Sequence, residues 1–343
     1  MRSRVGTSFV SIAFLFLFVV APLEDWAQAT KAKSKTGKQA AVQAGLACKL
    51  EGHEGAVNAV AFSPDGKQVL SGGFDHSLRI WDVHKAKLIS NITDATGHIS
   101  GVVSWQTGKG RTAVQFSAVS TDHGNDQISV LNLTTQTPLP KLSGYGHGVN
   151  SIRVAASGLL FAASGDGCIH AWNLSTGRHV QQIEIQELGG AWAVSEDGKW
   201  LVCQSQGDYV RGYDVASKKV LFKSPPLANG TVSLLLSKDA KQALAFSSDQ
   251  KLRTLSTKDG TIAKETELPG PPVSCSAFSS DGKLLLLGHN SGAVTLLDAS
   301  TLKSKAEFFE HKEPVLCVAF SADSKSAVSS SKEGLIAVWN LPD

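Results

Sequence analysis

The sequence lacks the residue patterns on which most enzymes and cofactor sites depend. It contains no phosphate-binding loop of the form GxxxxGKS or GxxxxGKT, no zinc-protease HExxH and no serine elbow GxSxG leading into a helix. The absence of CxxCH excludes covalently attached c-type haem, and the absence of any CxxC gives no support to a zinc or dithiol redox site. We therefore expect no catalytic residues, no cofactor and no metal ligands.

The chain is also poor in charge and in methionine. Charged residues make up 18% of 343 residues and apolar residues 42%, which excludes wholesale disorder. The net charge of +3 resides near the N-terminus, where Lys31, Lys33, Lys35 and Lys38 lie close together. Because the rest of the chain is nearly neutral, composition gives no support to a nucleic-acid-binding domain.

Cysteine is scarce, and its number is odd. The five cysteines cannot all pair with one another, so at least one thiol is free. Cys275 and Cys317 fall at equivalent places in apolar runs, and we expect buried free thiols that act as small hydrophobes.

The N-terminus has the three parts of a secretory signal peptide. Arg2 and Arg4 precede an apolar run at residues 5–21, and Ala27-Gln28-Ala29 offers a cleavage site. We expect cleavage after Ala29, so that residues 1–29 are removed and the chain is periplasmic or extracellular. The alternative is that residues 5–21 stay as a membrane anchor. Residues 30–45 are expected to be a basic flexible linker.

An internal repeat dominates the rest of the chain. Seven aromatic or leucine residues each end a short β-type run, and the gaps between them are 50, 41, 41, 42, 42 and 42 residues: Trp81, Leu131, Trp172, Tyr213, Leu255, Leu297 and Trp339. Such a regular period indicates repeated structural units that stack side by side.

Each unit has the same predicted strands and turns. In the first unit, alternating strands flank the turn Ser63-Pro64-Asp65-Gly66, and this turn recurs in four later units. Four antiparallel strands per unit form a sheet with two apolar faces, which a ring of such sheets buries. The second unit is longer than the others, and its extra residues fall at 106–111 or at 121–126. A cation site at Asp122–Asp126 is an alternative to a plain polar loop there.

These repeats resemble the WD-repeat (WD40) β-propeller family. Gly52-His53, the turn at Asp75 and Trp81-Asp82 match its motif, and the resemblance covers residues 46–343. It implies an all-β, seven-bladed β-propeller with four antiparallel strands per blade. Because the chain ends after the third strand of blade seven, the resemblance also implies that an N-terminal strand at residues 47–50 closes that blade.

The family stabilises its blades with a network of His, Ser or Thr, Asp and Trp. Carried over to this sequence, the structural tetrads are His53, Ser71, Asp75 and Trp81 in blade one, and His311, Ser329, Glu333 and Trp339 in blade seven. Glu333 departs from the family pattern. The other histidines, among them His98 and His147, are expected to be structural rather than metal ligands.

The resemblance also places a candidate interaction surface at the mouth of the central channel. Its predicted residues are Asn58, Asn150, Gly190, Val232, Ser274 and Leu316, together with Phe74, Gly165, Gln206, Ser248, Asn290 and Lys332. The set is small and neutral with one aromatic, Phe74, and fits a peptide or protein partner.

We therefore expect an exported, non-enzymatic scaffold for protein–protein interaction, built as a monomeric propeller that binds a protein or peptide. One alternative is a hydrolase or lactonase-like propeller with its pocket at the channel mouth. Another is a membrane-anchored assembly subunit that retains residues 5–21.

Overall fold

The computed structural model describes residues 45–342, apart from 94–97, 100, 108–109, 117–127, 133–134, 136, 146–147, 186–187, 228–229 and 269. The chain divides into two compact units, Met1–Ala40 and Ala41–Asp343, and all described residues belong to the second. The predicted signal peptide, the linker up to residue 44, the loop Asp122–Asp126 and His147 lie outside the described residues.

The described residues form strands, turns and loops, and the strands make seven four-stranded antiparallel sheets. Sheet one contains β2 (Val57–Phe62), β3 (Gln68–Gly73), β4 (Leu78–Asp82) and β5 (Lys87–Ile92). Sheet two contains β6 (Gly101–Thr107), β7 (Gly110–Phe116), β8 (Ile128–Asn132) and β9 (Thr137–Leu142). Sheet three contains β10 (Val149–Val154), β11 (Leu159–Ser164), β12 (Cys168–Asn173) and β13 (Arg178–Glu184).

The remaining four sheets follow the same order. Sheet four contains β14 (Leu188–Val194), β15 (Trp200–Ser205), β16 (Tyr209–Asp214) and β17 (Val220–Lys223). Sheet five contains β18 (Thr231–Leu236), β19 (Gln242–Ser247), β20 (Lys251–Ser256) and β21 (Ile262–Glu267). Sheet six contains β22 (Val273–Phe278), β23 (Leu284–His289), β24 (Ala293–Asp298) and β25 (Ser304–Phe309). Sheet seven contains β26 (Val315–Phe320), β27 (Ser326–Ser331), β28 (Ile336–Asn340) and β1 (Leu46–Leu50).

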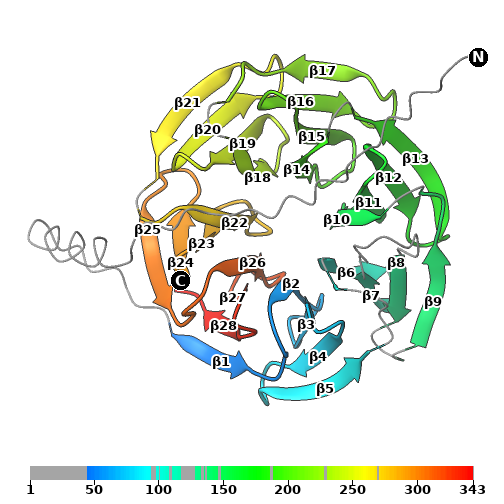
Figure 1. Cartoon of the computed structure of the whole chain (residues 1–343), viewed down its shortest axis with the longest axis vertical. Helices are drawn as coiled ribbons and strands as arrows, with labels where there is room; N and C mark the ends of the chain where they lie inside the picture. Colours follow the sequence, from blue (N-terminus) through cyan, green and yellow to red (C-terminus); the bar gives the residue numbers. More distant parts are fainter. Residues whose placement is uncertain are drawn as a thin grey trace, which may run out of the picture. The chain divides into compact units, whose positions relative to one another are not determined.

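The sheets stand around a common axis (Figure 1). The first strand of each sheet is innermost, and the innermost strands contact one another in chain order: β2, β6, β10, β14, β18, β22 and β26. Because β26 also contacts β2, the sheets form a closed ring. Each sheet therefore packs both of its faces against neighbouring sheets.

The prediction of a seven-bladed propeller with four antiparallel strands per blade is wrong, because the second sheet does not form a complete blade. Six sheets have ladders of three or more residue pairs between all neighbouring strands. In the second sheet, β7 and β8 are joined by the single pair Ala113↔Leu131, although β6–β7 and β8–β9 are well paired. The described residues thus contain six complete blades and one sheet of two loosely joined hairpins. The additional residues of this repeat separate its two halves along the sequence.

The ring is closed by the N-terminal strand, as the sequence predicts. β1 pairs antiparallel with β28, from Leu46↔Trp339 to Leu50↔Ile336. Leu50 is 1% exposed, whereas Leu46 at the other end of β1 is 39% exposed. Strand β1 thereby covers the backbone groups that would otherwise be an open edge of the last sheet.

The turns predicted from the Ser-x-Asp sequence are stabilised by their own side chains. Ser63 Oγ donates to Asp65 Oδ1 at 2.6 Å, and the same oxygen of Asp65 accepts the backbone N–H of Lys67. The Ser–Asp hydrogen bond recurs in blades four to seven, at Ser195–Asp197, Ser237–Asp239, Ser279–Asp281 and Ser321–Asp323. These short local contacts fix the register between the first and second strands of these five blades.

The core lies between the blades. The second strand of a blade is buried along almost its whole length, as in β3, β23 and β27. Trp81 packs between blades one and seven and Trp339 between blades seven and six, whereas Leu297 holds the corresponding place between blades six and five. Each fully buried large side chain contributes about 1.5–3 kcal/mol of burial free energy.

Candidate functional site

The predicted interaction residues lie on one end of the ring. A repeated backbone hydrogen bond shows that five of these residues hold the same position in their blades. In each case, the residue that follows the second strand donates its N–H to the carbonyl of the residue that precedes the first, innermost strand. The donors are Phe74, Gly165, Ser248, Asn290 and Lys332, and the acceptors are Ala56, Gly148, Gly230, Pro272 and Pro314. The structure thus brings these turns to one face, as the resemblance implies.

A second set of predicted residues sits at a bulge in the innermost strands. The register shifts after the first residue of β2, β10, β18, β22 and β26, and the extra residues are Asn58, Asn150, Val232, Ser274 and Leu316. In β14 the shift spans residues 189–191 and includes Gly190. A bulge re-aims a side chain away from the ordinary alternation of the strand.

Two of these bulge residues connect neighbouring blades. Asn58 Nδ2 donates to Ile99 O of the second sheet at 3.3 Å, and Ser274 Oγ donates to Val315 O of blade seven at 2.6 Å. Both side chains are half-buried, and so are those of Leu316 and Asn290. The exposed members of the predicted surface are Phe74, Asn150, Gln206, Ser248 and Lys332.

Phe74 is the largest exposed apolar side chain on this face, with 56% of its surface exposed. Its ring stacks on the imidazole of His98, with 3.6 Å between the ring centroids, and His98 Nδ1 donates to the backbone oxygen of Phe74 at 2.8 Å. The ring centroid of His76 lies 4.5 Å from that of His98, and the backbone of His76 has a positive φ of 60°. We name Phe74, His76 and His98 the Phe74 cluster. It is held in place by stacking and by a backbone hydrogen bond, so it is preorganised for contact.

The blade-one tetrad residues are joined by hydrogen bonds. His53 Nδ1 lies 2.9 Å from Asp75 Oδ2, and His53 Nε2 lies 2.7 Å from Ser71 Oγ. Trp81 Nε1 donates to Ser71 Oγ at 2.8 Å. Ser71 therefore donates to His53 and accepts from Trp81, which satisfies every buried polar atom of the set.

The turn carboxylate of this blade is strongly acidic. Burial alone would raise the pKa of Asp75, but hydrogen bonds from His53, from Ser77 and from the backbone N–H of Glu54 outweigh it and lower the pKa to about 2. Arg79 Nη2 adds an ion pair at 3.2 Å. Arg79, which lies two residues before Trp81 in β4, thus contacts the carboxylate of the turn.

Blade seven has the same network with one defect. His311 Nε2 lies 2.6 Å from Ser329 Oγ, and Trp339 Nε1 donates to the same oxygen at 2.9 Å. Glu333 accepts the backbone N–H of Lys312 but lies 3.7 Å from His311 Nδ1. Burial lowers the pKa of His311 to about 4, against the opposing effect of Glu333 and Glu310.

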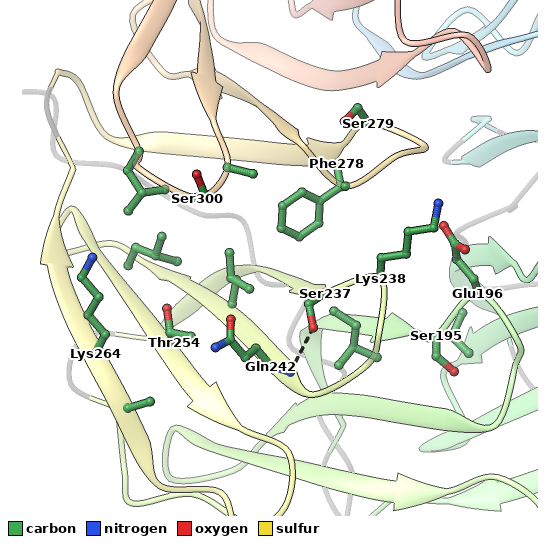
Figure 2. Close-up of a pocket in the computed structure, with 18 residues that line it drawn as sticks. Ser195, Glu196, Ser237, Lys238, Gln242, Thr254, Lys264, Phe278, Ser279 and Ser300 are labelled. Carbon is green, nitrogen blue, oxygen red and sulfur yellow. Dashed lines mark hydrogen bonds between the residues drawn. The ribbon is translucent and has the colours of Figure 1, made fainter.

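A cavity of about 510 Å³, which the sequence analysis missed, opens beside blades four, five and six (Figure 2). Its apolar wall includes Leu244, Leu252 and Phe278, and its polar rim includes Ser237, Lys238 and Lys264. Phe278 points into the space, whereas the Lys238 amine lies near Glu196 at the rim. The cavity follows from packing between blades, where Leu297 replaces the tryptophan of blades one and seven. Glu196 is the one carboxylate among its lining residues, which include no histidine or cysteine.

Arg153 is the one charged residue on the described innermost strands. It interacts electrostatically with Cys317 of blade seven, although two sheets separate their blades around the ring. Its guanidinium carbon lies 5.4 Å from the centroid of the Trp192 ring, and Nη1 donates to Ile152 O at 2.7 Å. No carboxylate of the described residues forms an ion pair with Arg153.

The cysteines of the described residues are free thiols, as predicted. Cys168 and Cys203 are buried, whereas Cys48, Cys275 and Cys317 are half-buried. Burial raises the pKa of Cys203 to about 12, which makes this thiol chemically inert at neutral pH. Within the described part of the chain, no helix is long and apolar enough to span a membrane.

The sequence is similar to several families and proteins of the propeller class. The WD domain, G-beta repeat family matches residues 45–82 and 136–173, and the Vps8 beta-propeller family matches residues 242–342. Autophagy-related protein 16 of Arabidopsis thaliana is 21% identical over 85% of this chain and 57% of its own length. Apoptotic protease-activating factor 1 of Homo sapiens is 24% identical over 81% of this chain and 22% of its own length. Nuclear distribution protein nudF of Aspergillus niger is 31% identical over 50% of this chain and 38% of its own length.

The closed ring of four-stranded sheets makes this chain a β-propeller. Within the β-propellers, the hydrogen-bonded tetrads and the matched repeats are features of the WD-repeat type. The matched repeats and the similar proteins support a WD-repeat β-propeller. It spans between about a fifth and three fifths of the length of the three relatives described above.

Proposed function

We propose that this chain is an exported, non-enzymatic scaffold that binds a protein or peptide partner through the Phe74 cluster. WD-repeat propellers typically bind protein partners. The observation that carries the proposal for this chain is the exposed and stacked ring of Phe74, which lies on a face of otherwise small or polar side chains. A rigid aromatic side chain with a polar surround has the character of an interface hot spot.

The neighbouring groups define what the partner must provide. The imidazoles of His76 and His98 lie beside the Phe74 ring, and the exposed amide of Asn150 lies on the same face. An apolar side chain would cover the ring, and neighbouring backbone carbonyls or carboxylates of the partner would accept hydrogen bonds from the His76 imidazole and the Asn150 amide. We therefore propose a peptide segment with one buried apolar anchor as the partner.

The test is a comparison of Phe74→Ala with Phe309→Ala. Phe309 is 67% exposed on the outer strand β25, so it provides a matched loss of exposed aromatic surface away from the proposed site. Crosslinking in the native envelope followed by mass spectrometry should show partners that are lost with Phe74→Ala and kept with Phe309→Ala. An unchanged partner set with Phe74→Ala would show that the site is elsewhere. Both variants should melt within a few degrees of the wild type, because exposed side chains change stability by about 0.5 kcal/mol or less.

Export is a separate part of the proposal. It is supported by the basic residues Arg2 and Arg4, the apolar run at residues 5–21 and the Ala27-Gln28-Ala29 site. N-terminal sequencing of the protein from fractionated cells should give Thr30 as the first residue in the exported fraction. An intact Met1 in a soluble cytoplasmic fraction would contradict export and would leave the binding proposal untouched.

A further inference from the structure

Blade three keeps the turn aspartate of blade one and replaces two other polar residues of that pattern with groups that bind metal ions. Asp166 lies in the turn before β12, and Cys168 and His170 follow it at every second position. Alternate residues of a strand share one face of the sheet, so the thiol and the imidazole point the same way. The residues at these positions in blade one are Asp75, Ser77 and Arg79. The change from hydroxyl and guanidinium to thiol and imidazole converts a hydrogen-bonded turn into a set of metal donors.

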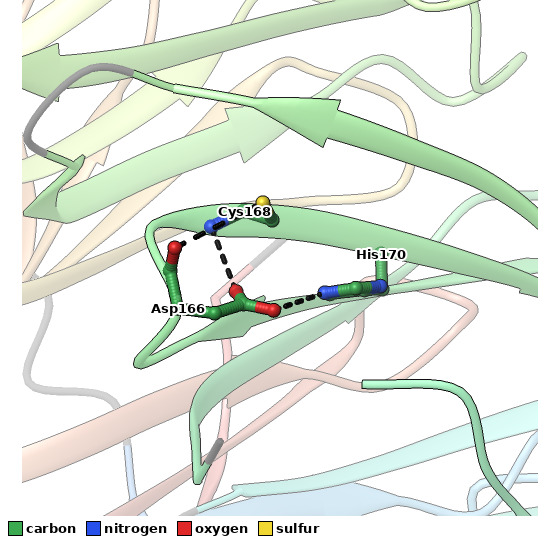
Figure 3. Close-up of side chains that lie close together, drawn as sticks. All are labelled: Asp166, Cys168 and His170. Atoms are coloured by element: carbon green, nitrogen blue, oxygen red, sulfur yellow. Dashed lines mark hydrogen bonds and ion pairs between the residues drawn. The ribbon is translucent and has the colours of Figure 1, made fainter. Parts of the chain in front are cut away.

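The three donor groups are already close together (Figure 3). One ligand atom from each of Asp166, Cys168 and His170 lies within 4.8 Å of the other two. His170 Nε2 and Asp166 Oδ2 are 2.9 Å apart, and the backbone N–H of Cys168 donates to Asp166 Oδ1 at 2.9 Å. Cys168 is 5% exposed and His170 1% exposed, so protein atoms hold the donors in place.

A second imidazole supports the first one. His179 Nε2 lies 3.1 Å from His170 Nδ1, the nitrogen that faces away from Asp166. His179 pairs with Trp172 across β12 and β13, and the corresponding partner of Trp81 in blade one is Leu88. A metal-binding histidine usually donates its second ring N–H to an acceptor that fixes its tautomer. His179 is placed to be that acceptor.

We propose that Asp166, Cys168 and His170 form a binding site for a borderline-soft divalent cation, of which Zn²⁺ is the best match. Carboxylate oxygen, thiolate sulfur and imidazole nitrogen together are typical zinc donors, and the two negative charges neutralise the ion. The site has three protein ligands, so the fourth tetrahedral position is left to water or to another ligand. The inference goes beyond the scaffold function and does not depend on it.

The proton changes on binding are balanced. Without metal, His170 Nε2–H donates to Asp166 and His179 Nε2–H donates to His170 Nδ1. When the ion takes His170 Nε2, that proton leaves to solvent, and His170 Nδ1 takes the proton of His179 Nε2. His179, which is exposed, regains a proton from water at its Nδ1. Both imidazoles stay neutral, and the thiol proton of Cys168 is the net proton released.

The experiment uses the full untagged chain and Co²⁺ as a spectroscopic substitute for Zn²⁺. We expect one Co²⁺ per chain, a thiolate-to-cobalt charge-transfer band in the near ultraviolet, and displacement of the band by one equivalent of Zn²⁺. The decisive variant is the double substitution Cys168→Ser and His170→Arg, which installs the side chains of blade one. This variant should keep its melting temperature without metal and lose the band. Its retention of the band would place the metal at another cysteine and overturn the proposal.

A second variant tests the role of His179. His179→Leu restores the residue type of blade one and leaves all three ligands intact, so Zn²⁺ should still bind but about 10- to 100-fold more weakly. An unchanged affinity would show that His179 does not support the site. A wild-type chain that gives no thiolate band with saturating Co²⁺ would show that the cluster is only a variant of the hydrogen-bonded turn.

Discussion

The Nδ1 nitrogen of His311 lies 3.7 Å from Oε1 of Glu333, whereas the equivalent nitrogen of His53 lies 2.9 Å from Asp75. Among the described residues, His311 Nδ1 is one of two buried side-chain polar atoms without a hydrogen-bond partner. The Glu333 carboxylate instead accepts the backbone N–H of Lys312 at 3.0 Å. One additional methylene group thus separates a complete tetrad from an incomplete one.

The shorter carboxylate should repair blade seven. Glu333→Asp places the carboxylate as in blade one, and we expect a gain of about 1 kcal/mol in the free energy of unfolding, because a buried donor regains its acceptor. Urea or thermal denaturation checks this. The reciprocal change Asp75→Glu is the control, and it should lower stability by a similar amount. A loss of stability with Glu333→Asp would show that the contact to Lys312 matters more.

The stability of the ring should fall in mild acid because of His311. Its pKa is lowered to about 4 in the folded state, below the ordinary value of 6.5. The neutral form is therefore favoured by folding, and the contribution is fully present above pH 6.5. As the pH falls, the unfolded chain binds the proton first, and up to about 3 kcal/mol is lost by the time the pH reaches the folded pKa.

A variant isolates this contribution from those of other groups. His311→Gln cannot titrate, so the difference in unfolding free energy between wild type and variant should shrink between pH 6.5 and pH 4. Chemical denaturation across this range measures the difference. A difference that stays constant would mean that His311 does not titrate below its ordinary pKa in the folded protein.

Closure of the ring should depend on one end of β1. Leu50→Ala removes a side chain that is 1% exposed and packs among residues of blades one and seven, and we expect a loss of about 2–4 kcal/mol. Leu46→Ala is the control on the same strand, and because Leu46 is 39% exposed it should cost less than about 1 kcal/mol. Equal effects of the two variants in thermal unfolding would contradict the closure described here.

Two arginines should respond differently to neutral substitution, because Arg253 is buried and paired whereas Arg153 is exposed and has no ion pair among the described residues. Arg253 is 5% exposed and pairs with Asp249 at 2.7 Å and Glu265 at 2.9 Å. Glu265 keeps its ion pair with Lys251, but Arg253→Gln removes the cation beside Asp249 and should cost about 3 kcal/mol. Arg153 has no carboxylate partner among the described residues, and desolvation lowers its pKa. Arg153→Gln should therefore leave stability unchanged or raise it by about 1 kcal/mol. Equilibrium unfolding of both variants, side by side, decides the point.

The sequence predicts the strands well where the repeat is regular. The positions of Trp81, Trp172 and Trp339, together with the Ser-x-Asp turns, determine the strand order, because local side-chain contacts fix each hairpin. It predicts the second sheet poorly, because a longer repeat does not show which strands lose their pairing. The single pair Ala113↔Leu131 depends on three-dimensional packing.

In the candidate sites, too, the sequence predicts local features but not the contacts that depend on three-dimensional packing. The sequence predicts Phe74 as part of an interaction surface, but its stacking on His98 joins residues 24 positions apart and could not be read from a local motif. The cavity beside blades five and six arises from contacts between blades and has no local motif. Asp166-x-Cys168-x-His170 is visible in the sequence as donors at alternate positions of a strand, but the sequence alone does not show that their ligand atoms lie within 4.8 Å of one another.

Because β1 completes the sheet of β26, β27 and β28, the ribosome makes β1 long before its partner strand β28. The five residues of β1 have no partner strand until almost three hundred further residues have been synthesised. Until then, the unpaired edge of β1 can form backbone hydrogen bonds with strands of other chains. Accidental pairing with a second nascent chain would yield exchanged dimers. The speed of elongation and the presence of chaperones should therefore govern how much correctly closed protein a cell obtains.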